Sequence, residues 1–361
     1  MSAPKPIEGI LNITPYKGGD SALEDGGEVI KLSSNETPLG PSPRAIEAVK
    51  AMAGDLHRYP DGGANDLRGA LAGHYGLDRE RLVCSNGSDE LIAYLTHAYA
   101  GPGDEVLYSE HGFLMYPLSA MAAGATPVKA PESDMTASVD NLLAAVTART
   151  RIVFLANPNN PTGTYLPLSE VRRLREGLRE DVLLVVDAAY AEYVSRNDYE
   201  PGVELVDAFD NVVMTRTFSK IYGLAALRLG WAYCPQAIAD VYNRVRSPFN
   251  VNAAAQAAGC AALADVAHTD KARAHNDQWL PWLTAAFEKH GFAVIPSVGN
   301  FISVRFPDAA AALGHFNAAG ILPRAIAGYG MAEHLRFTIG TAEENRAVAE
   351  AARALAEAAD G

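Results

Sequence analysis

The sequence of 361 residues predicts an α/β protein. A large domain has a mixed, mostly parallel central sheet flanked by helices, and a smaller α/β domain comes from both ends of the chain. Strand-like and helix-like segments alternate through the middle of the chain, as in βαβ units. Some strand-like runs, such as residues 151–156, are apolar almost throughout, as in strands buried on both faces. The ends differ from this middle part, because they are turn-rich before residue 45 and helix-rich after residue 250.

The predicted elements follow in order, separated by Gly, Pro and Asn. The first strand, residues 81–85, leads through an Asn-Gly-Ser turn into a helix at 89–99. The next apolar runs predict strands at 105–108, 151–156, 182–186, 211–215 and 228–234. The smaller domain is expected to contain helices at 253–264 and 347–359 and strands at 301–306 and 335–339. We expect an N-terminal arm and part of the small domain in 1–45, the large domain in 46–250 and the rest of the small domain in 251–361.

Composition excludes several classes of protein. The net charge is −13 and no Lys/Arg cluster is present, which disfavours nucleic-acid binding. Three scattered cysteines, Cys84, Cys234 and Cys260, are too few for a disulfide framework or a zinc site, and no metal is expected. Neither a signal peptide nor a membrane-spanning run is evident. We therefore expect a soluble, cytoplasmic protein.

A single lysine carries the first chemical signal. Lys220 follows an apolar strand within Thr217-Phe-Ser-Lys220, and Arg228 lies eight positions later. A lone lysine is usually a solvated surface residue. At the end of a buried strand, however, its amine can be desolvated and act as a nucleophile or base. Such an amine forms a Schiff base with an aldehyde cofactor.

Polar residues follow two neighbouring strands. Asp187 ends an apolar run, and Tyr190 lies three positions on. Asp187 fits either a helix N-cap or a buried carboxylate opposite a pyridinium nitrogen, with Tyr190 bonding the ring oxygen of the cofactor. Asn157 opens the turn 157–163, which is either an ordinary Asn/Pro/Gly turn or the source of an amide for the same ring oxygen.

A glycine-containing turn opens the helix after the first strand. Gly87, Ser88 and Asp89 fit either a capping box or an anion site at a helix N-terminus. The expected anion is a phosphate, held also by Ser219 and Arg228. Ligands of open α/β sheets bind outside the carboxyl ends of the strands, where these segments converge.

These motifs resemble the fold-type I pyridoxal-phosphate aminotransferases. The match covers nearly the whole chain, and five segments narrow the resemblance to the histidinol-phosphate aminotransferases. The five segments are Ser34-Asn-Glu-Thr-Pro-Leu-Gly-Pro-Ser42, Arg58-Tyr-Pro-Asp-Gly62, Asn86-Gly-Ser-Asp-Glu90, Thr217-Phe-Ser-Lys-Ile-Tyr-Gly-Leu224 and Leu335-Arg-Phe-Thr-Ile-Gly340. The chain has Asp187-Ala-Ala-Tyr190 where the family often has Asp-Glu-Ala-Tyr, and Phe113 where tyrosine is common.

The resemblance implies pyridoxal 5′-phosphate as cofactor and assigns residues to it. Lys220 would form the internal aldimine and then move the proton, Asp187 would pair with the ring nitrogen, and Asn157 and Tyr190 would bind the ring oxygen. Phe113 would stack on the ring. Tyr59 would reach the cofactor phosphate of a neighbouring subunit, which implies a homodimer with shared sites. The phosphate would be held by Gly87, Ser88, Asp89, Thr217, Ser219 and Arg228, and the substrate would face Tyr16, Asn35, Arg324 and Arg336.

The reaction implied is a ping-pong transamination in histidine biosynthesis. L-Histidinol phosphate and 2-oxoglutarate would give imidazole acetol phosphate and glutamate. One site must then accept both a carboxylate and a phosphate ester, which suits a guanidinium. Arg336 is the main candidate and Arg324 its assistant, although each also fits a structural role. Three alternatives stay open: an aromatic amino-acid aminotransferase, a threonine-phosphate decarboxylase, and a non-catalytic cofactor-binding module of a regulator.

Overall fold

The computed structural model describes residues 4–6, 9–22 and 27–360. Its largest sheet has seven strands in the order β2-β10-β9-β8-β7-β3-β4. The strands from β9 to β4 run parallel to their neighbours, and β10 is antiparallel to both β9 and β2. The strand bounds are β2 Leu82–Ser85, β3 Glu105–Ser109, β4 Thr126–Ala130, β7 Thr150–Ala156, β8 Leu183–Asp187, β9 Val212–Thr217 and β10 Gly230–Tyr233.

Six of these strands lie where the apolar runs predict them. The seventh, β4, was not predicted because its sequence, Thr-Pro-Val-Lys-Ala, lacks an apolar run. It is an edge strand, and a proline and a lysine are typical of exposed edges. The structure therefore confirms the mostly parallel central sheet and adds one strand to its edge.

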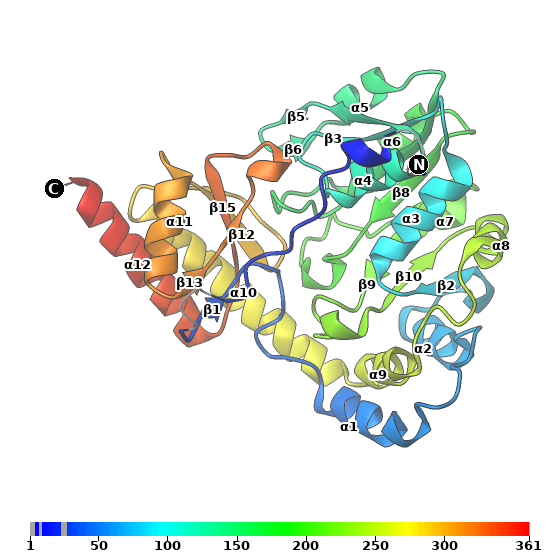
Figure 1. Cartoon of the computed structure of the whole chain (residues 1–361), viewed down its shortest axis with the longest axis horizontal. Coiled ribbons are helices and arrows are strands. Elements are labelled where there is room, and N and C mark those ends of the chain that lie inside the picture. Colours follow the sequence, from blue (N-terminus) through cyan, green and yellow to red (C-terminus); the bar gives the residue numbers. More distant parts are fainter. Residues whose placement is uncertain (1–3, 7–8, 23–26, 361) are drawn as a thin grey trace.

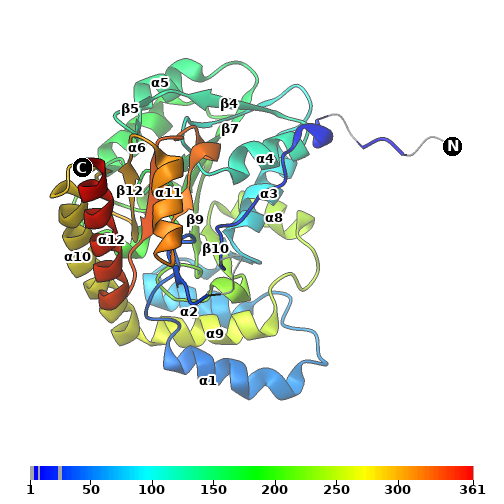
Figure 2. The same ribbon diagram turned by 60° about the vertical axis from the view of Figure 1, so that its left-hand side comes forward.

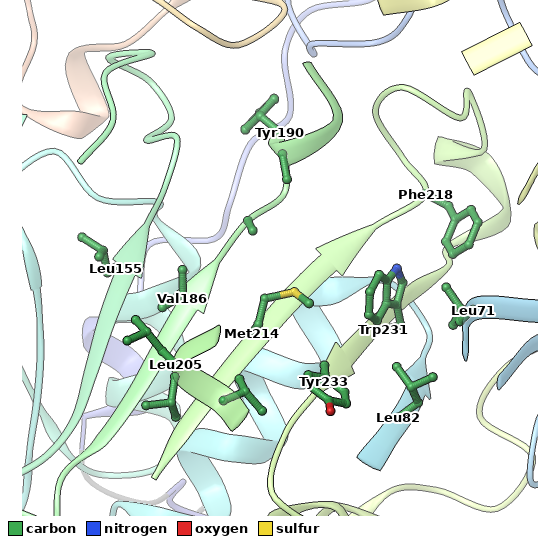
Figure 3. Packing of buried hydrophobic residues seen from close by; sticks show 14 of the residues in the cluster. Leu71, Leu82, Leu155, Val186, Tyr190, Leu205, Met214, Phe218, Trp231 and Tyr233 are labelled. Atoms are coloured by element: carbon green, nitrogen blue, oxygen red, sulfur yellow. The ribbon is translucent and has the colours of Figure 1, made fainter. Parts of the chain in front are cut away.

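Helices cover both faces of this sheet (Figure 1). Alternate residues of a strand point to opposite faces, so Val185 belongs to one buried apolar cluster while Leu184 and Val186 belong to the other. Figure 3 shows Val186 and Met214 on neighbouring strands of the larger cluster, with Tyr190 beyond the end of β8. The helices associated with this part of the chain are α2 Asn65–Tyr75, α3 Ser88–Tyr99, α4 Met115–Ala122, α5 Val139–Ala145, α6 Leu168–Gly177, α7 Val203–Ala208 and α8 Gln236–Val245.

A second, antiparallel sheet contains four strands in the order β11-β12-β15-β14. Helices pack on it around a core that includes Phe287, Phe306, Phe316 and Phe337. The elements of this part are α10 Val266–Glu288, β11 Ala293–Ile295, β12 Phe301–Arg305, α11 Ala309–Ala318, β13 Ile321–Leu322, β14 Arg324–Ala325, β15 His334–Thr338 and α12 Ala342–Asp360.

The start of the chain joins this second sheet region. β1 (Ile30–Lys31) pairs in parallel with β13, and Leu32 belongs to the same apolar core as Phe337. α9 (Ala253–Ala264) instead packs against α1 (Pro43–Met52) and α2, and Figure 2 shows α1 and α9 side by side. The domain limits at residues 45 and 250 stay predictions.

Short elements complete the fold. β5 (Glu132–Ser133) and β6 (Thr136–Ala137) form a two-stranded ladder. Single 3₁₀ turns lie at Ile10–Asn12, Ala53–Asp55, Arg79–Arg81, Ala191–Tyr193, Ala225–Leu227 and Ala327–Tyr329. Over the ranges that the structure describes, every helix is too short or too polar to cross a membrane.

Candidate active site

A cavity of about 310 Å³ lies at the carboxyl ends of β7, β8 and β9. Its wall is completed by the second sheet and by the N-terminal segment, which here means residues 16–22 and 27–35. Its volume is at the lower end of the range for small-molecule sites, about 300–1,000 Å³. The predicted site residues that line it are Tyr16, Asn35, Ser88, Asp89, Phe113, Asp187, Tyr190, Thr217, Ser219, Lys220, Arg228, Arg324 and Arg336. Three other predicted residues, Gly87, Asn157 and Tyr59, have different positions, described below.

Asp187 is the last residue of β8, and its buried carboxylate faces the cavity. Its Oδ2 accepts a 2.8 Å hydrogen bond from the Tyr116 hydroxyl, and its Oδ1 accepts one of 3.2 Å from Thr215. Burial raises the pKa of Asp187 to about 6, while these two hydrogen bonds oppose the rise. The carboxylate is therefore mainly charged at neutral pH, and a buried anion of this kind suits a cationic partner.

Lys220 lies in the loop after β9, and its amine reaches the same cavity. Lys220 Nζ donates a long hydrogen bond of 3.4 Å to the carbonyl oxygen of Ser34 and lies 5.6 Å from the ring centroid of Tyr190. Thr217 Oγ1 accepts from the backbone N–H of Ser219, which shapes the turn before the lysine. Among the ion pairs of the described residues, none involves Lys220, so its amine is not held by a carboxylate.

Tyr190 and Asn35 join the large sheet to the N-terminal segment. The buried Tyr190 hydroxyl accepts a 2.9 Å hydrogen bond from Asn35 Nδ2. Asn35 has a left-handed backbone with φ 55°, and its N–H donates to Thr338 Oγ1 at 2.9 Å. This conformation is uncommon for a non-glycine residue, and asparagine tolerates it better than most. Asn35 is therefore fixed at the cavity wall by contacts on two sides.

The start of α3 forms one end of the cavity. Gly87 precedes this helix with φ 81°, and a Cβ on it would lie 2.5 Å from Arg228 Nη2. Only glycine therefore leaves room for the guanidinium. Arg228 Nη1 donates to Ser219 Oγ at 3.3 Å, and its Nη2 contacts Asp89 at 3.4 Å. The Glu90 N–H donates to the Gly87 carbonyl, but over the described residues the N–H groups of Ser88 and Asp89 have no acceptor. Together with the guanidinium and the hydroxyl, these two groups can bind an anion.

Asn157 is not among the residues that line the cavity, although its neighbours Ala156 and Pro158 are. Asn157 Oδ1 accepts from the backbone N–H of Leu166, and its Nδ2 donates to the carbonyl of the same residue. Both ends of its amide are thus used inside the turn, and the side chain is fully buried. Asn160, three residues later, lines the cavity and accepts a hydrogen bond from Arg336. The Asn157 amide nitrogen carries a second N–H that its bond to Leu166 does not use, so the role of Asn157 at the ring oxygen stays a prediction.

Two further arginines line the cavity. Arg336, on β15, is buried and donates to the Ser33 carbonyl at 2.8 Å as well as to Asn160. Its Nε has no hydrogen-bond partner among the described residues, and burial lowers the pKa of this guanidinium. Arg324 donates to the Lys17 carbonyl at 2.6 Å, and its guanidinium lies 6.0 Å from the ring of Tyr16. A buried guanidinium without a carboxylate partner is suited to an anionic ligand.

The two predicted aromatic residues have different positions. Phe113 lines the cavity and packs edge-on against Tyr116, with centroids 5.9 Å apart. Tyr59 lies outside the cavity of its own chain and is 83% exposed. Its ring stacks on that of Phe249 at 4.7 Å, on the surface.

A buried polar cluster supports the site and was missed at the sequence level. Arg216 on β9 forms a 2.9 Å ion pair with Glu192, which follows Tyr190 by two residues, and both side chains are buried. The Tyr75 hydroxyl contacts Glu192 at 3.3 Å and the Tyr222 hydroxyl at 2.7 Å. These contacts tie the segment after β8 to the loop that carries the lysine. Arg216 inside an apolar strand is the signal that could have revealed this cluster, since buried charges are normally paired.

The cavity offers one anion site at α3, a second at Arg336, an amine and a buried carboxylate. An amine can form a covalent bond with a carbonyl group, and a buried carboxylate can stabilise a cationic ring. The arrangement therefore fits covalent chemistry on a ligand that carries a negative charge at each end.

Comparison with family models places residues 27–352 in the family described as aminotransferase class I and II. The chain is 62% identical over 356 residues to a histidinol-phosphate aminotransferase of Paramagnetospirillum magneticum, covering 97% of this chain and 98% of that one. It is 56% identical over 353 residues to a protein of the same name from Rhodospirillum rubrum, covering 96% of each chain.

Solved structures agree with this similarity. The crystal structure of a histidinol-phosphate aminotransferase from Sinorhizobium meliloti in complex with pyridoxal 5′-phosphate has a TM-score of 0.90 and 27% identity, with 99% of each chain covered. An aspartate aminotransferase from Thermus thermophilus has a TM-score of 0.82 at 21% identity and covers 92% of each chain, which shows the shared fold.

Proposed function

The chain belongs to the class I and II aminotransferase family, and from this premise we propose that it transfers the amino group between L-histidinol phosphate and glutamate. 2-Oxoglutarate and imidazole acetol phosphate are the corresponding keto partners, and pyridoxal 5′-phosphate is the cofactor. The observation that carries the proposal is the cavity itself, which Lys220 and Asp187 line together with the guanidinium groups of Arg228 and Arg336. The sequence identity to curated histidinol-phosphate aminotransferases favours this substrate over the alternatives.

The residues present fit the cofactor. Its phosphate suits the start of α3, where Gly87 leaves space for the guanidinium of Arg228. Its ring nitrogen suits the buried carboxylate of Asp187, which forms no ion pair with any residue that the structure describes. Its ring oxygen suits Tyr190 and the free N–H of the Asn157 amide, and Phe113 lies at the wall where a ring could stack. The residues that would hold the phosphate are Gly87, Ser88, Asp89, Thr217, Ser219 and Arg228.

The side chains of the cavity divide the chemistry between them. When bound, pyridoxal 5′-phosphate supplies a carbonyl that bonds to amines and a ring that accepts electrons. Lys220 Nζ would hold that carbonyl, and its amine would move the proton at the substrate Cα. Asp187 would hold a proton on the ring nitrogen, and Tyr190 would donate to the ring oxygen. Asn35 and Tyr329 form part of the cavity wall around these groups.

Arg336 explains how one site accepts two anions. The phosphate of histidinol phosphate and a carboxylate of glutamate each match the fork of a guanidinium. Arg336 holds its orientation through Ser33 and Asn160, and Arg324 lies nearby with a more exposed side chain. Tyr16 and Asn35 complete the substrate end of the cavity.

A half-reaction tests the substrate. L-Histidinol phosphate, titrated into the cofactor-loaded protein, should convert the cofactor absorbance at a concentration about tenfold or more below that needed for L-phenylalanine. The expected ratio follows from the charge-assisted hydrogen bonds that a phosphate gains at Arg336. Absorbance spectra recorded at each concentration give both midpoints.

Two matched variants test whether Arg336 binds the phosphate of the substrate in this titration. Arg336→Gln should raise the midpoint for histidinol phosphate about tenfold or more. Arg305→Gln should not, because Arg305 lies on the neighbouring strand and is exposed beside Glu333. If phenylalanine converts the cofactor as well as histidinol phosphate, the protein is an aromatic aminotransferase. Release of carbon dioxide from an amino-acid phosphate, without transamination, would point to the lyase.

We infer that two copies of the chain share their active sites. Tyr59 is 83% exposed, stacks on the 44% exposed Phe249 and lies near Leu56, which is 72% exposed. Such a cluster of exposed apolar side chains favours an interface. In this homodimer, Tyr59 of one subunit would contact the cofactor phosphate of the other.

Mixing two impaired variants tests the shared site. Lys220→Ala and Tyr59→Ala subunits, dissociated together and reassociated, should form mixed dimers in which one site is complete. Activity should then approach about a quarter of the wild-type value, because half of the dimers are mixed and each has one working site. As a control, Lys220→Ala mixed with Asp187→Ala should recover nothing, since both residues belong to the same cavity. Equal recovery in both mixtures, or in neither, would contradict the proposal.

We place the reaction in the cytoplasm. Cys84, Cys234 and Cys260 are free in the structure, and the first two are buried. Free cysteines are ordinary in reducing compartments, where histidine biosynthesis would have its substrates.

A further inference from the structure

A buried tyrosine contacts the carboxylate that faces the cofactor. Tyr116 lies in the first turn of α4, and none of its side chain is exposed. Its hydroxyl donates a 2.8 Å hydrogen bond to Asp187 Oδ2. Over the described part of the chain, this is the sole hydrogen bond of that hydroxyl. A buried hydroxyl is costly without a partner, so the position has a specific use for the oxygen that phenylalanine could not supply.

The ring of Tyr116 is held on two sides. It lies parallel to the ring of Phe154 on β7, with centroids 4.6 Å apart and an interplanar angle of 2°. It meets Phe113, the wall residue suited to stack on the cofactor ring, edge-on at 87°. The hydroxyl therefore cannot turn away from Asp187 without disturbing the packing of both rings. One side chain thus links the wall of the cavity to the carboxylate.

From this geometry we propose that Tyr116 is a positioning residue, which fixes the Asp187 carboxylate toward the ring nitrogen of the cofactor and keeps it charged. This inference rests on the proposed function, because it requires a cofactor with a basic ring nitrogen. Thr215 plays a smaller part on the other carboxylate oxygen, through its longer hydrogen bond of 3.2 Å. Tyr116 does not touch the substrate, and it acts through Asp187.

The charged and titratable groups around Asp187 come from several elements. Asp89 at the start of α3 disfavours its charge, and Lys220 after β9 favours it. The buried hydroxyl of Tyr199 also lies within its electrostatic range. Burial is the largest influence and raises the pKa of Asp187, while Tyr116 is the largest opposing one. Burial also raises the pKa of Tyr116 well above its ordinary value, so the phenol stays a donor throughout the accessible pH range.

The test measures affinity for pyridoxamine 5′-phosphate as a function of pH, using cofactor-free full-length protein. This form of the cofactor lacks an aldehyde, so Lys220 cannot bond to it, and fluorescence titration reports binding without turnover. In Tyr116→Phe the pH midpoint below which affinity falls should rise by about one unit, because a hydrogen bond to a charged group is lost. The variant should then bind about fivefold more weakly than wild type near pH 6 and almost equally near pH 8.5.

Two further variants separate positioning from packing. Tyr108 belongs to the same apolar cluster, and its ring centroid lies 6.3 Å from that of Tyr116. Tyr108→Phe removes the hydroxyl of this tyrosine and should leave the pH midpoint unchanged. Thr215→Val should move the midpoint in the same direction as Tyr116→Phe, by a smaller amount. A Tyr116→Phe profile that coincides with wild type, or one weakened equally at every pH, overturns the proposal. Failure of the wild-type protein to bind the probe would instead contradict the proposed function.

Discussion

Replacing Lys220 by alanine is expected to abolish transamination while leaving cofactor binding measurable. Lys220 Nζ is the amine that reaches the cavity. General acid–base catalysis alone contributes about 10²–10⁴-fold, so the loss of this residue should reduce kcat by at least that amount. The phosphate site at α3 and the carboxylate of Asp187 stay in place. The variant should therefore still bind pyridoxal 5′-phosphate but show the spectrum of the cofactor without a bond to the protein.

The Lys220→Arg variant shows whether the enzyme needs the reactive amine of Lys220 or only its positive charge. An arginine keeps the positive charge but stays protonated, so it cannot act as nucleophile or base. We expect it to be as inactive as the alanine variant. A wild-type cofactor spectrum in Lys220→Ala would contradict the assignment of this residue. Turnover retained in Lys220→Arg would show that only the charge is needed.

Asp187→Ala should produce the second largest loss. The carboxylate stabilises positive charge on the cofactor ring, and removal of one such electrostatic group costs about 10²–10³-fold in kcat. In this protein the loss also leaves the hydroxyls of Tyr116 and Thr215 without their acceptor. Steady-state kinetics of the cofactor-saturated variant give the size of the effect, and near-normal turnover would contradict the role.

The role of Asp187 also predicts the direction in which cofactor affinity changes with pH. The pKa of Asp187 is raised to about 6, so the group becomes protonated and neutral as the pH falls through that value. Affinity of the cofactor-free protein for a protonated ring should therefore fall below about pH 6 and be highest above it. Asp187→Asn keeps the shape and loses the charge, so its affinity should be low without this pH dependence. Asp187→Glu retains the charge and should lose less activity than either variant.

Apolar runs were enough to predict most of the central sheet, because strands buried on both faces need apolar residues at nearly every position. They could not reveal β4, an edge strand rich in polar residues. They also placed the start of β10 too early. Arg228 has a left-handed backbone with φ 53°, so the strand begins only at Gly230. The direction of β10, antiparallel to both neighbours, is a property of chain connections that periodicity does not record.

The site residues that could be predicted were those that end apolar strands or open helices. Asp187 and Lys220 belong to this group, and the structure brings both to the cavity. Asn157 and Asn160 occupy one turn and are equivalent by composition, so only the backbone contacts of Leu166 distinguish them. Tyr116 looked like an ordinary core residue, because its importance lies in a contact between a helix and a strand 71 positions away.

The wall that Asn35 forms with its neighbours connects the beginning of the chain to its end. The Asn35 N–H bonds to Thr338, and the Ser33 carbonyl accepts from Arg336, in each case across 303 positions of sequence. During synthesis on the ribosome, the seven strands of the large sheet emerge long before these partners exist. Contacts of such high contact order form late and slowly. The large sheet can therefore fold first. A complete cavity can form only after β15 has left the ribosome and has made its hydrogen bonds to the N-terminal segment.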